Sequence, residues 1–377
     1  MSVLAKIFRC SASVFLRDSR TLLERNELIN PVRKLELHRR ISSSSLRSCQ
    51  THSAAVLYEF NKELKVEKVT KTKKIKPEEV RVDVYSCGVN AADALIVTSD
   101  YEIKPTLPFI PGFELSGEVT EVGSNVTGIK PGDRIIGLNK EKFGGFSEEA
   151  ILDYKDVWKM PQSMAFDQAA AIADCYSTAL IAARRANIKP GDLVLVTAAA
   201  GGLGLAAVDI AANLFKAKVI GACGTEDKAT LVREKGAFSA VNYKRESLPD
   251  VVKKFSNGKG VKVVFDAVGG DMFESVLDCV SHEGSVIVAG FASRKIPAIQ
   301  TSRLLPKSCA LIGVSLSEYR LATNDVYRNT VSEIINLYGD QYIEPHISAT
   351  FPLNKACERS NRFCETTEIN RKSCTGC

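Results

Sequence analysis

The sequence predicts an α/β protein with two parts, a β-rich part and a doubly wound parallel sheet covered by helices. Between residues 53 and 159, short runs that alternate apolar and polar residues are separated by turn signals. From about residue 167, near-continuous apolar runs alternate with helical patterns, which is typical of a parallel sheet. A glycine-rich loop joins the first of these runs to a helix. The 377 residues suffice for two domains of ordinary size.

Three segments of the first part read as strands: residues 55–60, 80–85 and 117–122. Their apolar residues recur at every second position, so one face of each strand is expected to be buried. Turn-forming residues such as Asn61-Lys62 and Lys130-Pro131-Gly132-Asp133 separate the runs. These features predict antiparallel strands.

The second part begins with a helical stretch over residues 167–187. Strands are expected at residues 193–197, 218–222, 261–266 and 284–289, and helices at 203–215, 227–235, 249–255 and 272–280. An amphipathic pattern predicts a further helix over residues 324–338. The strand-helix alternation favours a parallel sheet covered by helices on both faces.

The first fifty residues differ in composition from the rest of the chain. They hold ten Lys and Arg against four Asp and Glu, with serines at 42–45 and 48. This predicts a mitochondrial transit peptide over residues 1–50, cleaved between Arg40 and His52, and therefore a protein of the matrix. The alternative is a disordered basic tail that carries no targeting signal. Because much of the net charge of +6 lies there, and the body shows no aromatic-basic interleaving, nucleic acid is not expected as a partner.

Two further features exclude other classes. No run of about eighteen apolar residues appears, so no membrane span is expected. The eleven cysteines show no disulfide spacing and read mostly as reduced, buried thiols. Cys374 and Cys377 form a CxxC pair at the end of the sequence, but two ligands do not make a closed metal site.

The glycine-rich loop carries the strongest functional signal. The predicted strand at 193–197 runs into Ala198-Ala199-Ala200-Gly201-Gly202-Leu203-Gly204-Leu205, where a helix begins. Ala199, Gly201 and Gly204 hold the three glycine positions of the G-x-G-x-x-G pattern. The second position lets the backbone approach a pyrophosphate, which then lies at the helix N-terminus. With its strand, helix and following βα units, the loop predicts a dinucleotide site rather than a structural turn.

The nicotinamide is expected to be NADPH. An NAD enzyme usually has an acid at the end of the second strand, whereas this sequence has Cys223-Gly224-Thr225. The small residues leave room for a 2′-phosphate, and Lys228 could pair with it. Glu226 and Asp227 argue for NAD, but acids also suit the start of a helix.

Several motifs resemble the zinc-free quinone reductases of the medium-chain dehydrogenase/reductase superfamily. They are Gly88-Val89-Asn90-Ala91-Ala92-Asp93, Pro111-Gly112-Phe113-Glu114, Gly144-Gly145-Phe146-Ser147-Glu148 and the glycine-rich loop. The resemblance covers about residues 53–353. It implies a GroES-like catalytic domain over 53–174, completed by 318–377, and a Rossmann NADP-binding domain over 175–317, with the cofactor in the cleft between them. It also suggests a homodimer through the strand at 310–316.

The resemblance further implies cofactor contacts. Thr178, Val268, Gly290 and Phe291 would lie near the nicotinamide, and Tyr243 would lie beside the 2′-phosphate. Dehydrogenases of the superfamily hold a catalytic zinc at positions that match Asn90, Phe113 and Asp174 here. An amide, a phenyl ring and one carboxylate lack the donors that zinc prefers, and Cys175 is isolated. No metal is therefore expected.

Without a Lewis acid, the expected acceptors are quinones or other electrophilic enones, reduced by hydride transfer. Asn90 is the candidate donor to the developing oxyanion, or else only a turn residue after a strand. Tyr101 and Tyr58 could line the substrate side or pack, and Leu95 stands where the family often has a tyrosine. The sequence gives no general acid. An enoyl-thioester reductase of the same superfamily and a non-catalytic NADPH-sensing binding protein are the alternatives.

The end of the chain departs from the family. Residues 356–377 are polar and cysteine-bearing and carry no strand signal. The catalytic domain is therefore expected to lack an edge element, which would reduce its stability or activity.

Overall fold

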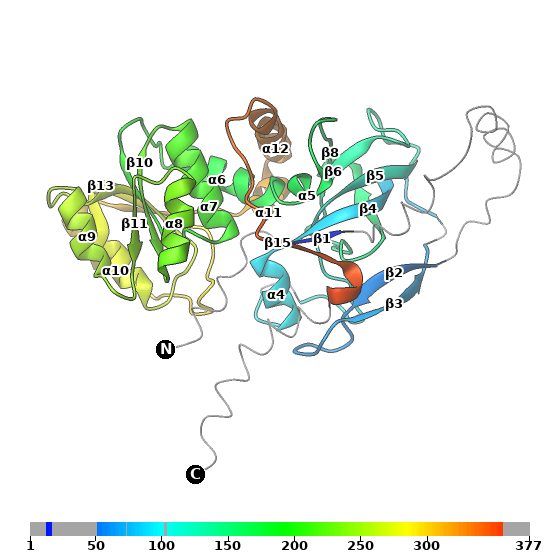
Figure 1. Cartoon of the computed structure of the whole chain (residues 1–377), viewed down its shortest axis with the longest axis horizontal. Coiled ribbons are helices and arrows are strands. Elements are labelled where there is room, and N and C mark those ends of the chain that lie inside the picture. The colour runs from blue at the N-terminus through cyan, green and yellow to red at the C-terminus, as the bar shows by residue number, and fades with distance from the viewer. Residues whose placement is uncertain (1–12, 17–50, 73, 102–103, 357–377) are drawn as a thin grey trace, which may run out of the picture.

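The computed structural model describes residues 13–16, 51–72, 74–101 and 104–356. Two large sheets lie side by side, with helices between them (Figure 1). One sheet is largely antiparallel and the other is parallel throughout. The predicted fold class, a GroES-like β-rich domain with a Rossmann domain, is confirmed.

The β-rich part is built around the long strand β4 (Glu79–Val89). The other strands of this sheet are β1 (Ser13–Leu16), β5 (Glu114–Val122), β6 (Arg134–Leu138), β7 (Glu149–Asp153), β8 (Val157–Lys159) and β15 (Ala349–Pro352). Their order is β15-β1-β4-β5-β6-β8, and β7 also pairs with β4. A separate hairpin consists of β2 (Thr51–Val56) and β3 (Lys65–Thr70). The strand expected at 55–60 therefore begins earlier and ends at Val56, because Leu57 makes only an isolated bridge to Phe109 and the chain turns at Asn61.

Strand β1 lies within the range expected to be a transit peptide. It pairs antiparallel with β4, from Ser13 opposite Val89 to Leu16 opposite Ser86, and parallel with β15. Among the described residues β15 has no other strand partner, so β1 alone connects it to the sheet. The transit peptide stays a prediction, since the rest of residues 1–50 lies outside the described part. The polar ending predicted at 356–377 lies outside it as well, apart from Ala356.

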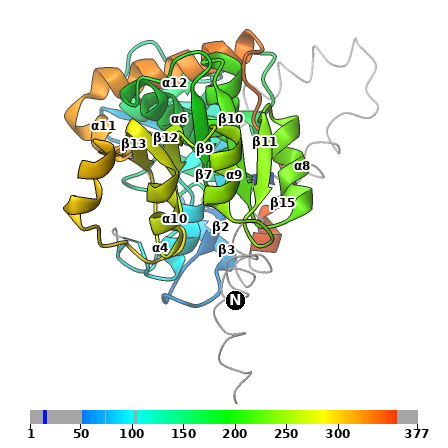
Figure 2. The ribbon, with the colours of Figure 1, turned by 90° about the vertical axis from the view of Figure 1, so that its left-hand side faces the viewer.

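The parallel sheet has six strands in the order β11-β10-β9-β12-β13-β14. Figure 2 shows its strands from β11 to β13. They are β9 (Leu193–Val196), β10 (Lys218–Cys223), β11 (Ser239–Asn242), β12 (Val261–Asp266), β13 (Val280–Val288) and β14 (Ala310–Gly313). The helices α7 (Gly202–Asp209), α8 (Glu226–Glu234), α9 (Leu248–Phe255) and α10 (Met272–Cys279) connect successive strands. The chain adds strands on one side of β9 and then returns to add β12 on the other. This switch point is where ligands bind in open α/β sheets.

Two expected helices are divided. The stretch at 167–187 forms α5 (Phe166–Ala169) and α6 (Ala173–Arg185). The turn between them brings the Ala170 carbonyl against β4, where a Cβ on Gly88 would lie 2.3 Å from its oxygen. The stretch at 203–215 is α7 followed by a π-helical segment, η2 (Ile210–Leu214). The other helices are α4 (Ala91–Val97), α11 (Leu316–Ala322) and α12 (Asn324–Gly339), with short 3₁₀ segments η1 (Tyr154–Asp156), η3 (Thr301–Arg303), η4 (Leu305–Lys307) and η5 (Leu353–Lys355).

One buried apolar cluster joins the two parts. It runs from the β-rich sheet through α6 and α12 to β9 and α7, with members such as Leu115, Leu180 and Val194 fully buried. The domain limits predicted from the sequence fall inside α6 and α11, which lie between the sheets (Figure 1). This shared core fixes the two sheets relative to each other and defines the cleft. No described helix is long and apolar enough to cross a bilayer.

Candidate active site

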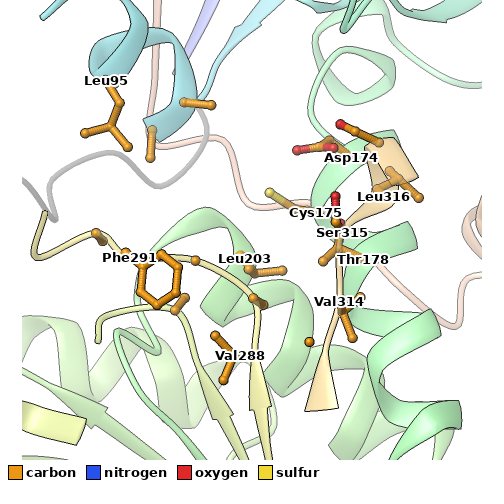
Figure 3. A pocket seen from close by; sticks show the side chains of 18 of the residues that line it. Leu95, Asp174, Cys175, Thr178, Leu203, Val288, Phe291, Val314, Ser315 and Leu316 are labelled. Atoms are coloured by element: carbon orange, nitrogen blue, oxygen red, sulfur yellow. The ribbon is translucent and has the colours of Figure 1, made fainter. Parts of the chain in front are cut away.

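A cavity of about 900 Å³ lies between the two parts of the molecule. Its floor is formed by the carboxyl ends of the parallel strands, and α4, α6 and α11 supply its walls (Figure 3). Ala198 follows β9, Ala267 follows β12, and Gly290 and Phe291 follow β13. A cavity of this size and position is typical of a ligand site in a doubly wound fold.

The glycine-rich loop forms one side of the cavity. Gly201 is the N-cap of α7, and Gly201, Gly202, Leu203 and Gly204 all line the cavity. Because the first N–H groups of a helix have no partner within it, they can bind an anion placed there. A Cβ on Gly204 would lie 2.3 Å from the Ala198 carbonyl oxygen, so α7 approaches the loop as closely as a glycine allows. The geometry fits the pyrophosphate of a dinucleotide.

The residues expected around a 2′-phosphate meet at the carboxyl end of β10. Thr225 is the N-cap of α8, and its hydroxyl accepts from the Lys228 backbone N–H at 3.4 Å. The Tyr243 hydroxyl packs against Gly224, 3.0 Å from where a Cβ would stand. Glu226, the acid that argued for NAD, pairs with Arg233 of its own helix at 3.0 Å. The three predicted residues Thr225, Lys228 and Tyr243 thus share one corner, which lies outside the cavity lining.

The residues expected near the nicotinamide separate into two groups. Thr178, Gly290 and Phe291 line the cavity, as does Tyr101 from the β-rich part. Val268 does not line it: its side chain is buried and its backbone N–H donates to Asp266 Oδ1 at 3.2 Å. Its neighbour Ala267 takes that position. Ala199 is likewise buried beneath the glycine-rich loop.

Asn90 lies at the N-cap of α4, directly after β4. Its Nδ2 donates to Glu114 Oε2 at 2.9 Å, and it is absent from the cavity lining, whereas Ala91 and Leu95 are present. The amide is thus directed to a buried carboxyl. Its role as an oxyanion donor stays a prediction. Tyr58 is about half exposed and donates to Glu67 on the hairpin, away from the cavity lining.

Two buried carboxyls lie behind this wall. Glu114 Oε1 accepts from the Asp174 backbone N–H at 2.9 Å, and burial, assisted by the nearby Asp174, raises the pKa of Glu114 to about 8. Asp93 accepts from the N–H groups of Asn90 and Gly112, and burial raises its pKa to about 7. At neutral pH both groups therefore hold a proton for a substantial fraction of the time.

Sequence reasoning missed Lys140, which lines the cavity two residues after β6. Its ammonium forms an ion pair with Asp174 Oδ1 and lies 5.1 Å from the centre of the Phe113 ring. Burial alone would lower the pKa of Lys140, but Asp174 raises it overall. Apart from this ion pair, Asp174 Oδ1 has no partner in the described part of the chain. A single lysine in a loop gave no signal, because its partner comes from a distant helix.

The positions that match zinc ligands in related dehydrogenases lie close together. Asn90 Oδ1 is 4.0 Å from Cys175 Sγ, and the Phe113 ring faces Lys140. Within the described residues no group of three or more His, Cys, Asp and Glu side chains is placed to hold a metal ion. Asn90, Phe113 and Asp174 together do not provide the nitrogen and sulfur donors of a catalytic zinc site.

Two family models match the chain. Residues 76–162 match the alcohol dehydrogenase GroES-like domain, and residues 202–336 match the zinc-binding dehydrogenase model. A quinone oxidoreductase-like protein 2 homolog of Nematostella vectensis is 42% identical over 340 residues, covering 87% of this chain and 93% of the relative. The quinone oxidoreductase-like protein 2 of Rattus norvegicus is 41% identical, covering 81% and 86%.

The solved structures agree with the sequences. The crystal structure of Escherichia coli quinone oxidoreductase complexed with NADPH superimposes with a TM-score of 0.75 at 29% identity, covering 84% of this chain and 97% of the other. Its fold, like the two family models, spans both sheets and the cleft between them. The chain therefore belongs to the quinone oxidoreductase branch of the medium-chain dehydrogenase/reductase superfamily.

Proposed function

We propose that this chain is an NADPH-dependent reductase of quinones or other electrophilic enones that works without zinc. The observation that supports this most directly is the cavity itself, in which the start of α7 faces a space that also contains Thr178, Phe291 and Tyr101. When bound, the nicotinamide would supply a hydride. The residues of the chain would bind the pyrophosphate at Gly201–Gly204 and keep water from the reacting atoms.

The preference for NADPH is supported by the corner at the end of β10. Lys228 offers a positive charge there, Thr225 offers a hydroxyl, and Glu226 is paired with Arg233. A carboxylate that bonds the ribose 2′-hydroxyl is the usual mark of an NAD site, and Cys223 to Thr225 provide none. The Escherichia coli relative is described as a complex with NADPH.

The zinc-free mechanism is supported by the side chains at the wall. Asn90 is bonded to Glu114, and the Phe113 ring faces an ammonium, so neither is suited to hold zinc. We also propose that the protein acts in the mitochondrial matrix, because its first fifty residues are basic and rich in serine. Pairing of two copies along the edge strand β14 would give a homodimer; β14 is the outer strand of the parallel sheet and is partly exposed.

The test is acceptor-dependent oxidation of NADPH by the full chain, followed by absorbance with benzoquinones, naphthoquinones and simple enones. We expect turnover that survives a metal chelator, with NADH at least about ten times poorer in kcat/KM. Loss of turnover on chelation would contradict the zinc-free mechanism. NADPH binding without oxidation by any acceptor would favour a cofactor-sensing protein instead.

A further inference from the structure

We propose that Lys140 is a catalytic residue, whose ammonium stabilises the negative charge that develops on the carbonyl oxygen of the acceptor. This inference rests on the proposed function and names a specific group in the same site. A fixed positive charge would take the electrostatic part that a metal ion plays in other dehydrogenases.

The ammonium is held in the cavity wall beside the expected nicotinamide site. Lys140 lines the cavity with its side chain 17% exposed, and its partner Asp174 is 16% exposed. Asp174 precedes Thr178 by four residues on α6, so both side chains project from one face of the helix (Figure 3). A cofactor ring beside Thr178 would therefore have Lys140 within about one helical turn of it.

The ammonium retains donors for a ligand. A lysine ammonium has three N–H donors, and Asp174 is the one hydrogen-bonding partner of Lys140 in the described residues. The face of the Phe113 ring, 5.1 Å away, covers another side without accepting a conventional hydrogen bond. Two donors thus remain for an oxygen in the cavity.

The surrounding charges leave the ammonium effective. Asp174 faces it directly, whereas Glu114 and Asp93 lie behind, and burial raises the pKa of both carboxyls and so reduces the negative charge they carry. Tyr101, which also lines the cavity, contributes to raising the pKa of Lys140. In a partly buried wall, a charge acts on a nearby oxyanion more strongly than it would in water.

The reaction balances without another co-reactant. A bound nicotinamide would supply a hydride, with two electrons and one hydrogen, and would itself be oxidised as the acceptor is reduced to an oxyanion. Lys140 would stabilise this oxyanion as a cation rather than as a proton donor, because its ion pair with Asp174 raises its pKa. The oxyanion then takes one proton from water.

A purely structural role for Lys140, the neutralisation of Asp174, makes a different prediction. If the ammonium stabilises the developing charge, its loss must matter most for acceptors that stabilise that charge poorly themselves. If the ammonium only neutralises Asp174, its loss must lower kcat/KM by the same factor for every acceptor.

The experiment measures kcat/KM of wild type and Lys140→Met with quinones and enones of graded reduction potential. We expect a loss of about 10²-fold with the weakest acceptors and a smaller loss with the strongest. The plot of log kcat/KM against potential would then be steeper for the variant, while the Kd for NADPH stays unchanged. Lys140→Arg should restore part of the lost rate. The matched control is Lys142→Met, since Lys142 pairs with Glu79 at 2.6 Å and lies outside the cavity lining.

The outcomes separate the two hypotheses. If Lys140→Met folds poorly, the double variant Lys140→Met/Asp174→Asn removes the ion pair as a whole and should give the same steeper plot. Parallel plots, or unchanged rates, would overturn the role of Lys140 and leave the proposed reductase intact. If the wild type fails to oxidise NADPH with every acceptor tested, the proposed function is refuted, and the inference about Lys140 is refuted with it.

Discussion

Replacing Gly204 by alanine tests the central feature of the cofactor site, the close approach of α7 to the loop that follows β9. A Cβ at this position would lie 2.3 Å from the Ala198 oxygen and 2.7 Å from Ala199 Cα. Ordinary contacts begin at about 3.4 Å, so the helix or the loop must move by about 1 Å. Both neighbours are backbone atoms, which cannot turn aside as a flexible side chain can.

The magnitude follows from the size of this displacement. Overpacking of a close-packed interior costs about 1–3 kcal/mol, and the rigid neighbours favour the upper end. We therefore expect the unfolding temperature of Gly204→Ala to fall by about 5 °C or more. The displaced N–H groups at the start of α7 would lose charge-assisted hydrogen bonds to the pyrophosphate, each worth about 1.5–3 kcal/mol. NADPH affinity should fall by about 10-fold or more.

The assays are thermal unfolding and titration of NADPH, followed by the fluorescence of the nucleotide. Gly202→Ala is the stability control, because it lies in the same first turn and its Cβ would meet only Cys175 Sγ at 3.4 Å. It should unfold at the wild-type temperature. If Gly204→Ala also matches wild type in unfolding temperature and NADPH affinity, the close approach does not constrain the site and the reasoning is wrong.

Three further predictions concern other parts of the molecule. Lys228→Ala should weaken NADPH binding by about 10-fold and leave NADH binding unchanged, as measured by the two Kd values, and equal losses would contradict a 2′-phosphate site. The pKa of Glu114 is raised to about 8, so its contribution to stability is full below its unfolded pKa of about 4.5 and is lost as the pH rises through about 8. The unfolding free energy, measured by denaturant titration, should therefore decline between pH 4.5 and pH 8 by about 2–4 kcal/mol less in Glu114→Gln than in wild type. An equally steep decline in the variant would contradict the raised pKa of Glu114. A chain without residues 1–16 should unfold several degrees below one without residues 1–12, because only the latter keeps the strand between β4 and β15; equal unfolding temperatures would mean that β1 contributes nothing.

The features that the sequence predicted well depend on local pattern. Alternating and continuous apolar runs identified both sheets, since the period of the pattern follows directly from which faces are buried. The loop at Gly201–Gly204 was recognisable because its glycines serve backbone geometry, which the structure has at Gly204. Thr178 lines the cavity, and its contact with the nicotinamide, which the family resemblance implies, stays a prediction.

The features that the sequence could not predict depend on partners from distant segments. Lys140 belongs to the site only because α6 brings Asp174 to it. Asn90 allowed two interpretations, and its side chain is directed by Glu114, which comes from the next strand of the sheet. The sequence predicted Val268 at the cavity, whereas the neighbouring Ala267 lines it. The backbone hydrogen bond from Val268 to Asp266 determines this shift of one residue.

Strand β1 shows a similar limit at the level of the fold. A four-residue strand in a basic, serine-rich segment carries too little periodicity to be recognised, and its position is determined by the two strands it joins. The sequence predicted that the catalytic domain would lack an edge element after residue 356. In the structure, β15 is attached to the sheet through β1, so the N-terminal segment of the full chain contributes to the same domain, and cleavage of the predicted transit peptide would remove this strand.

The groups around the cavity include a cation that would stabilise a negatively charged oxygen of the substrate. Oxidation requires a group that takes a proton from the hydroxyl. Two carboxylates that line the cavity are engaged, since Asp174 pairs with Lys140 and Asp100 pairs with Arg294 at 2.8 Å, and Glu318 lines the cavity as well. No histidine is among the described residues that line the cavity. Reduction instead requires a positive group near the oxygen that becomes negative, and Lys140 supplies one. The ion pair with Asp174 raises the pKa of Lys140, so this group stays an ammonium and is not available to take a proton from an alcohol. Because the cation would stabilise the same transition state in either direction, it does not by itself select reduction over oxidation.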